Sequence, residues 1–182
     1  MPYIQSESRP KYDVFINRLL ETIPTDADEI TIVEYTAYSI SQIMGKFLGV
    51  YDISSNDDLF NCRLFEGQRR DAIFTISERI ASEVGASRNM LQQAGDLNYI
   101  ISFLTWGVLG DAPNRTRAGY GMRAFMKGCL QEVIASLKPY YGYNRYFVMA
   151  RAVLTDVIDE TYRRRTAPYE DEKIEQNGDL WT

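Results

Sequence analysis

The stretch EITIVEYTAYSISQIMGKFLG, Glu29 to Gly49, decides the fold class. Its apolar residues recur three or four positions apart and are Ile30, Val33, Ala37, Ile40, Met44 and Phe47. This spacing places them on one stripe of a helix. Thr25 or Asp26 can cap the N-terminal end of that helix, and Gly49 can stop it. We therefore expect a helix over this stretch that buries one apolar stripe.

The same spacing recurs on both sides of that stretch. Toward the N-terminus it predicts a helix that begins after Pro10 and ends before Pro24. On the other side, SSNDD at residues 54–58 is expected to begin a third helix, which bends at Gly67 and ends at Gly85.

Three more helices are predicted in the rest of the chain. Ser87 is expected to cap the fourth, and the loop DAPNR at 111–115 separates it from the fifth. Asn144 is expected to cap the sixth. No stretch alternates at period two for long enough to form a strand. We therefore expect an all-α, single-domain bundle of five to seven helices over residues 1–182.

Composition narrows the class of protein. Apolar residues make up 45% of the chain, yet none of their runs approaches the ~20 residues that span a bilayer, and the start MPYIQSESRPK has no signal-peptide core. We expect no membrane contact and a cytoplasmic location. The net charge of −5 and the dispersed arginines disfavour binding to nucleic acid.

The chain contains no histidine, which excludes Ser-His, Cys-His and His-ligated zinc sites within one chain. Cys62 and Cys129 each lie alone within a helical apolar pattern, so we expect reduced, buried thiols. We expect no cofactor.

The closing stretch APYEDEKIEQNGDL, Ala167 to Leu180, has a simple structural interpretation. Pro168 suits the first turn of a helix, because its missing N–H would be unpaired there. Acidic residues in that turn, beginning with Glu170, favour the helix dipole, and Asn177-Gly178 provides a left-handed stop. These features predict a short, capped terminal helix.

Four pieces of the chain carry a family resemblance: MPYI at Met1 to Ile4, GDLNY at Gly95 to Tyr99, Tyr143-Asn144, and YRRRTAPYEDEKIEQNGD at Tyr162 to Asp179. Together they resemble an uncharacterised family of short phage and bacterial proteins. The resemblance implies that residues 25–87 are a helical insertion relative to short members. It implies a phage-like origin, which would place the protein in a host cytoplasm, and it brings no established activity.

The positions matched by the resemblance are the candidate ligand-binding residues: Asp96, Asn98, Tyr99, Asn144, Arg163, Arg164, Tyr169 and Glu170. Two interpretations stay open. In one, these side chains form a structural polar network in which Arg163 or Arg164 pairs with Glu170 or Asp96. In the other, the helix with Asn98 and Tyr99 meets the C-terminal segment, and an arginine and a tyrosine bind the phosphate and the base of an anionic nucleotide-like molecule.

A binding role is favoured over catalysis. By analogy with the size and lifestyle of phage proteins, we expect a small helical protein that sequesters a nucleotide-like signalling ligand of host defence. One alternative is a structural or regulatory protein that acts through protein contacts. The other is a Mg²⁺-dependent nucleotide hydrolase that uses Asp156 and Glu160, which share a helix face.

The aromatic residues exceed what one buried face per helix can hold. Those expected at a subunit surface are Tyr35, Tyr38, Phe103, Trp106, Tyr140, Tyr141 and Tyr146. Because aromatic residues at a surface often mark subunit contacts, they predict a homo-oligomer.

Overall fold

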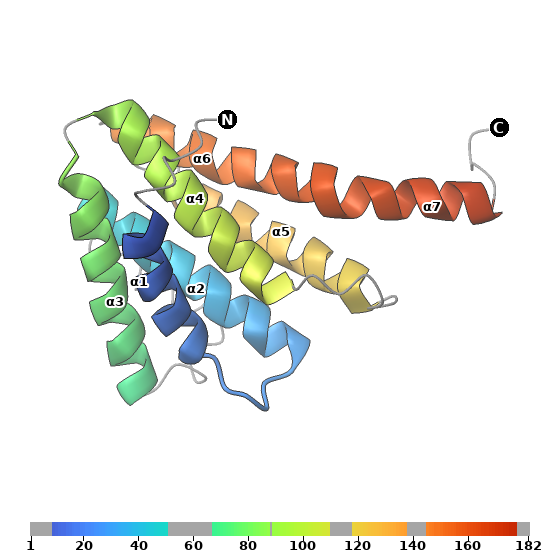
Figure 1. The fold of residues 1–182 in the computed structure, drawn as a ribbon, viewed down its shortest axis with the longest axis horizontal. Helices are drawn as coiled ribbons and strands as arrows, with labels where there is room; N and C mark the ends of the chain where they lie inside the picture. The colour runs from blue at the N-terminus through green and yellow to red at the C-terminus, as the bar shows by residue number, and fades with distance from the viewer. Residues whose placement is uncertain (1–8, 51–66, 88, 110–117, 138–144, 178–182) are drawn as a thin grey trace.

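The protein is a bundle of helices (Figure 1). The computed structural model describes residues 9–50, 67–87, 89–109, 118–137 and 145–177. Within these ranges the elements are α1 (Arg9–Glu21), α2 (Glu29–Leu48), α3 (Gln68–Gly85), α4 (Met90–Leu109), α5 (Ala118–Leu137), α6 (Arg145–Thr161), the π-helix η5 (Tyr162–Thr166) and α7 (Ala167–Asn177). They include no strand, which confirms the all-α fold class. No helix of the described ranges is long and apolar enough to cross a membrane.

Helix α2 lies at the centre of the core. It packs against α3, α4, α5 and α6, and every residue from Tyr35 to Gly45 is buried. The expectation of a single buried stripe was therefore too narrow, and its first member, Ile30, is 58% exposed. The polar faces can be buried because small hydroxyl side chains bond to carbonyls of their own helix: Thr36 donates to Ile32, Ser39 to Tyr35 and Ser41 to Tyr38.

The caps of α2 agree with the sequence at one end only. Gly49 adopts the left-handed conformation, with φ of 70°, as predicted. The N-cap is Asp28 rather than Thr25 or Asp26, and its Oδ1 accepts the backbone N–H of Thr31 at 2.7 Å. This bond lowers the pKa of the Asp28 carboxyl. The cap lies later because a turn closes first, with the N–H of Ala27 bonded to the carbonyl of Pro24.

Two other helix starts differ from the prediction. Helix α3 begins at Gln68, because Gly67 has φ of 72° and ψ of −142° and no helix can continue through it. The predicted bend is thus a helix start, and 54–58 lie outside the described residues. Helix α4 is capped by Asn89, whose Oδ1 accepts the N–H of Leu91 at 2.9 Å, while Oγ of Ser87, two residues earlier, accepts the N–H of Asn89. Loop 111–115 also lies outside the described residues.

The core contains side chains that the sequence placed at a subunit surface. Tyr35 and Tyr38 are buried on α2, so they do not belong to the surplus of surface aromatics. Phe103 is 38% exposed, whereas Tyr140 and Tyr141 lie outside the described residues. Cys129 is a buried free thiol on α5, as expected, and Cys62 is not among the described residues.

Helices α6, η5 and α7 form one continuous rod, residues 145–177, rather than a helix followed by a separately capped one. Thr161 and Ala167, at the two ends of η5, both have right-handed helical dihedrals. The N–H of Ala167 bonds to the carbonyl of Tyr162, five residues earlier. In an α-helix the ring of Pro168 would crowd the carbonyl of Arg164, and the wider π turn just before it relieves that contact. Figure 1 shows α7 continuing the line of α6 beyond the ends of the other helices. It ends at Asn177, as predicted.

Candidate functional site

Two of the predicted site residues lie on the side of α4 that faces α1. The hydroxyl of Tyr12 donates to Oδ2 of Asp96 at 2.7 Å, and the hydroxyl of Tyr99 donates to Oδ1 of Asp13 at 2.6 Å. The first pair is buried, and its burial raises the pKa of Tyr12 well above the ordinary range. The second is half-buried, and burial together with Asp13 raises the pKa of Tyr99 to about 12. Both pairs therefore join α1 to α4.

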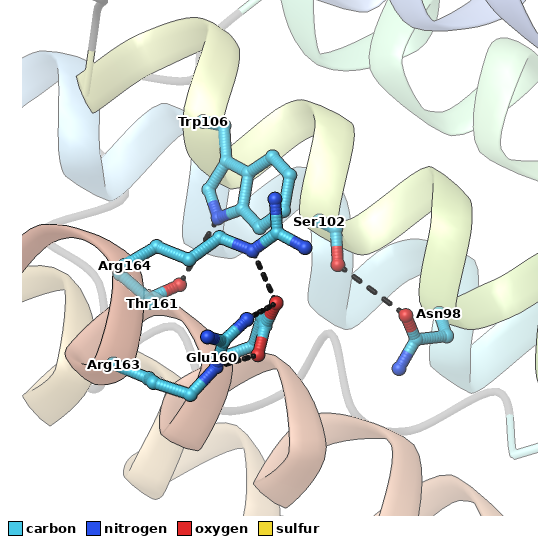
Figure 2. Close-up of polar contacts among 7 residues, drawn as sticks. All are labelled: Asn98, Ser102, Trp106, Glu160, Thr161, Arg163 and Arg164. Carbon is cyan, nitrogen blue, oxygen red and sulfur yellow. Dashed lines mark hydrogen bonds and ion pairs between the residues drawn. The ribbon is translucent and has the colours of Figure 1, made fainter. Parts of the chain in front are cut away.

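Asn98 lies on the side of α4 that carries Ser102 and faces the rod (Figure 2). Its Oδ1 accepts the hydroxyl of Ser102 at 3.5 Å. One turn further along, Nε1 of Trp106 donates to Oγ1 of Thr161 at 3.3 Å. Of the two α4 residues that were expected to meet the C-terminal segment, the structure thus brings Asn98 to this side and places Tyr99 against α1.

The two arginines of the predicted site share a carboxylate. Arg163 donates from Nε and Nη2 to the two oxygens of Glu160, at 2.8 and 2.7 Å, and Arg164 donates from Nε to Oε1 (Figure 2). The guanidinium of Arg164 also lies over the ring of Trp106, 5.1 Å from its centroid. The hydrogen bond from Arg163 is the main cause that lowers the pKa of Glu160 to about 2.

The structure corrects the acidic partner that the network interpretation gave to Arg163 and Arg164. The acid between the arginines is Glu160, whereas Asp96 pairs with Tyr12 and Glu170 with Tyr162. Glu160 is also half of the pair assigned to Mg²⁺ in the hydrolase alternative, and here its oxygens accept from arginines while Asp156 is exposed. Among the residues the structure describes, no group of three acidic or thiol side chains is placed to hold a metal ion.

A partly enclosed pocket of about 210 Å³ lies between α5 and the rod, next to this cluster. Its wall is mainly apolar, with Met126 and Leu130 from α5 and Ile158 from α6. The polar side chains of the lining are Thr105, Arg123, Lys127, Gln131, Thr161, Tyr162, Thr166 and Glu170. The pocket therefore joins α4, α5 and all three parts of the rod.

One hydroxyl of the pocket is buried and has no partner in the described part of the chain. Thr105 is fully buried, and its Oγ1 has no hydrogen-bond partner among the described residues. Leaving a hydroxyl buried and unpaired costs about 1–3 kcal/mol. Thr105 is also one of the residues that line the pocket.

Charge in the pocket comes from three side chains. Arg123 and Lys127 are four residues apart on α5 and so share a face of that helix. The third is Glu170, whose Oε2 accepts the hydroxyl of Tyr162 at 2.7 Å. The lining thus contains two cationic side chains and one carboxylate, in a chain whose net charge is −5.

The predicted site residues are thus distributed over three places. Glu170 lines the pocket, Asn98, Arg163 and Arg164 lie on the neighbouring face, and Asp96 and Tyr99 face α1. Asn144 and the side chain of Tyr169 lie outside the described part of the chain.

Of the residues that line the pocket, only Glu170 was among the predicted site residues, and Thr105, Arg123 and Lys127 were missed. The four-residue spacing of Arg123 and Lys127 was a readable signal. Thr105 could not be identified, because the sequence does not show whether the hydroxyl of a threonine in an apolar helix has a hydrogen-bond partner.

The chain belongs to the family described as Domain of unknown function (DUF6899), whose model matches residues 1–180. This match confirms the resemblance to an uncharacterised family, while the phage and bacterial origin stays a prediction. Neither the curated proteins nor the solved structures contain a match to the chain.

Proposed function

We propose that this protein binds a small anionic, nucleotide-like molecule in the pocket between α5 and the rod, and sequesters it without chemical change. The observation that carries the proposal is the hydroxyl of Thr105, which is buried at the pocket and lacks a partner among the described residues. Protein interiors seldom leave such a group unpaired. A ligand atom that bonds to Oγ1 satisfies it.

The charge of the pocket selects an anion. Arg123 and Lys127 lie on its α5 side, and Lys127 is exposed to solvent. Phosphate is a good partner for such a pair, because guanidinium and ammonium groups both form charge-assisted hydrogen bonds with its oxygens. Glu170 on the opposite wall repels a second anionic group there and so helps to set the orientation of the ligand.

The size of the pocket decides how much of the ligand enters. Its volume of about 210 Å³ is below the roughly 300–1,000 Å³ of pockets that enclose drug-sized ligands. It therefore takes one part of the molecule. A flat ring with polar edges fits best, because Met126, Leu130 and Ile158 offer apolar contact while Thr105 offers one hydrogen bond. The phosphate then remains outside, near Lys127.

Sequestration as the role rests on binding alone. A protein that lowers the free concentration of a signalling nucleotide of host defence needs a dissociation constant below the concentration of that nucleotide. It needs no proton transfer and no metal. The phage setting is part of the proposal and comes from the sequence resemblance.

Thermal-shift measurements test the proposal. The panel holds mono-, di- and cyclic nucleotides, with nucleosides and inorganic phosphate as separate arms. At a hundredfold excess over the dissociation constant, a ligand stabilises a protein by about 2.7 kcal/mol, or roughly 5–10 °C in a chain of this size. We expect at least one nucleotide to give such a shift and phosphate alone to give less. A flat response to every nucleotide at millimolar concentration overturns the proposal.

A charge variant locates the binding. Lys127→Ala removes one cation at the pocket and should weaken nucleotide binding by about tenfold, the lower end for a charge-assisted bond because the side chain is exposed. Arg79→Ala is the matched control, since Arg79 is an exposed cation on α3 away from the pocket. Equal loss in both variants would place the binding elsewhere or make it nonspecific.

A further inference from the structure

The rod carries opposite charges in two neighbouring segments. Residues 162–166 contain three arginines and no acid, whereas residues 167–177 contain four acids and one lysine. A cationic block is thus followed directly by an acidic one. A surface with this order is complementary to a copy of itself that runs in the opposite direction.

The two blocks present a common face. The hydrogen bond from Tyr162 to Glu170 shows that side chains eight residues apart across η5 meet on one side of the rod. Arg163 and Asp171 are also eight residues apart. They therefore share a face of the rod next to the one that carries Tyr162 and Glu170. Ile174 and Glu175 follow Asp171 at three and four residues and extend that face along α7.

This face is accessible in the structure. Asp171, Glu172 and Glu175 are exposed, and Ile174 is 46% exposed although it is apolar. α7 extends past the bundle, so a second helix can approach it (Figure 1). The side chain of Arg163 is 66% exposed and that of Arg164 is 39% exposed while both are held by Glu160, which fixes their direction before any partner arrives (Figure 2).

We propose that two copies of the chain pair through this face, antiparallel about a two-fold axis that crosses the rod near the junction of η5 and α7. Arg163 and Arg164 of one copy then meet Asp171 and Glu175 of the other, and the symmetry repeats the contact. A parallel arrangement would align like charges and is disfavoured. Ile174 adds apolar contact against the aliphatic stems of the arginines.

The strength of the pair follows from its chemistry. Exposed ion pairs each contribute little to association and are screened by salt. With several such pairs and little apolar area, the dimer is weak, so its formation is tested at high protein concentration and low salt. The pairing face consists of Arg163, Arg164, Asp171, Ile174 and Glu175, and none of these residues lines the pocket. The test of the dimer is therefore independent of the test of ligand binding.

Sedimentation velocity of the full-length chain tests the pairing. At about 100 μM protein in about 50 mM salt, we expect a mass near twice the 21.0 kDa of one chain. Raising the salt to about 500 mM should weaken association by at least tenfold. A chain that is monomeric at low salt, or a dimer that salt leaves unchanged, overturns the proposal.

Charge reversal tests which surface pairs. The combined variant Asp171→Lys, Glu172→Lys and Glu175→Lys should be monomeric at every salt concentration. The combined variant Glu21→Lys, Glu78→Lys and Glu132→Lys changes the net charge equally at exposed positions on α1, α3 and α5, and should still dimerise. Dimers of the first variant, or loss of dimers in both, would contradict pairing through the rod, and the salt series on the natural chain gives an answer even if a variant folds poorly.

Discussion

The hydroxyl of Tyr162 donates a 2.7 Å hydrogen bond to Oε2 of Glu170, eight residues further along the rod. In a regular α-helix, eight residues turn about 80° past alignment, so these side chains would diverge. The π turn of η5 takes up one extra residue and returns them to the same side. Pro168, which favours that wider turn, therefore shapes the wall of the pocket.

Thr105→Val should separate stability from binding. The substitution keeps the shape of the side chain and removes a buried hydroxyl that has no partner among the described residues. We expect the free protein to become more stable by about 1 kcal/mol, or roughly 2–4 °C in melting temperature. Nucleotide binding should weaken at the same time, by about tenfold, as measured by titration calorimetry.

Thr36→Val is the matched control. Thr36 is also buried in a helix, but its hydroxyl donates to the carbonyl of Ile32 at 2.9 Å. It lies outside the pocket lining, so this variant should leave nucleotide affinity unchanged and give no gain in stability. If Thr105→Val loses stability like an ordinary core threonine, the unpaired hydroxyl is not the feature that calls for a ligand.

The ion pairs of Glu160 should make the free energy of unfolding depend on pH in the acidic range. The pKa of Glu160 is lowered to about 2 in the folded chain, so the unfolded chain binds the proton more tightly. The stabilisation is complete above the unfolded value of about 4.5 and is lost as the pH falls to about 2. Glu160→Gln should therefore lower the unfolding free energy by about 1–2 kcal/mol at pH 7, with the arginines' exposure limiting the effect.

Urea denaturation of both proteins across that pH range checks this assignment. The difference between natural chain and Glu160→Gln should shrink toward zero near pH 2. Glu132→Gln, at an exposed position on α5, should change stability by less than about 0.5 kcal/mol at pH 7. A difference for Glu160→Gln that stays constant from pH 7 to pH 2 would show that the carboxylate charge is not its source.

The two tyrosine–aspartate hydrogen bonds between α1 and α4 should contribute unequally to the free energy of unfolding. Tyr12→Phe leaves the carboxylate of Asp96 buried without that donor and should cost about 1–3 kcal/mol. Tyr99→Phe removes a half-buried bond to Asp13 and should cost less. Chemical denaturation measures both, and neither variant should change nucleotide affinity. Loss of binding in Tyr99→Phe would instead restore Tyr99 to the ligand site.

Cys129 should be protected from thiol reagents. Burial raises the pKa of its thiol to about 11, so roughly one molecule in a thousand carries the thiolate at pH 8. In a Cys62→Ser variant, which isolates this thiol, the reaction with a disulfide reagent should be at least a hundredfold slower in the folded chain than in denaturant. Similar rates in the two states would mean that α5 does not bury it.

The fold class could be predicted from the sequence because helical spacing persists in every long segment. The start of α2 could not, since Thr25, Asp26 and Asp28 are all good caps and the turn closed by Ala27 decides among them. The burial of α2 on every face could not be predicted either. Serines and threonines read as a solvated face, although their hydroxyls can bond within the helix.

The candidate site was less predictable for a similar reason. The identity of Glu170 and of the two arginines could be read from the sequence, but the pairing of Glu170 with Tyr162 depends on the extra residue of η5. An α-helical count from Arg163 does not show whether Asp159 or Glu160 will face it, because both spacings are allowed. The pocket needs α4, α5 and the rod together, and no local pattern encodes that meeting.

Gly128 permits the most direct test of ligand binding in the pocket. It lines the pocket in the middle of α5, and a Cβ built there meets no atom within 4 Å. A larger side chain can therefore enter the free protein without a clash at its first carbon while taking volume from the ligand. Gly128→Leu should keep or raise stability, because glycine costs about 1 kcal/mol in a helix interior.

The decisive measurement is calorimetric titration of the best nucleotide into the natural chain, Gly128→Leu and Gly85→Ala. Gly85 is the matched control, since it ends α3, also has open space around a built Cβ and lies outside the pocket lining. We predict one site per chain in the natural protein and in Gly85→Ala, and at least a hundredfold weaker binding in folded Gly128→Leu. Undiminished binding by Gly128→Leu would contradict a ligand site in this pocket.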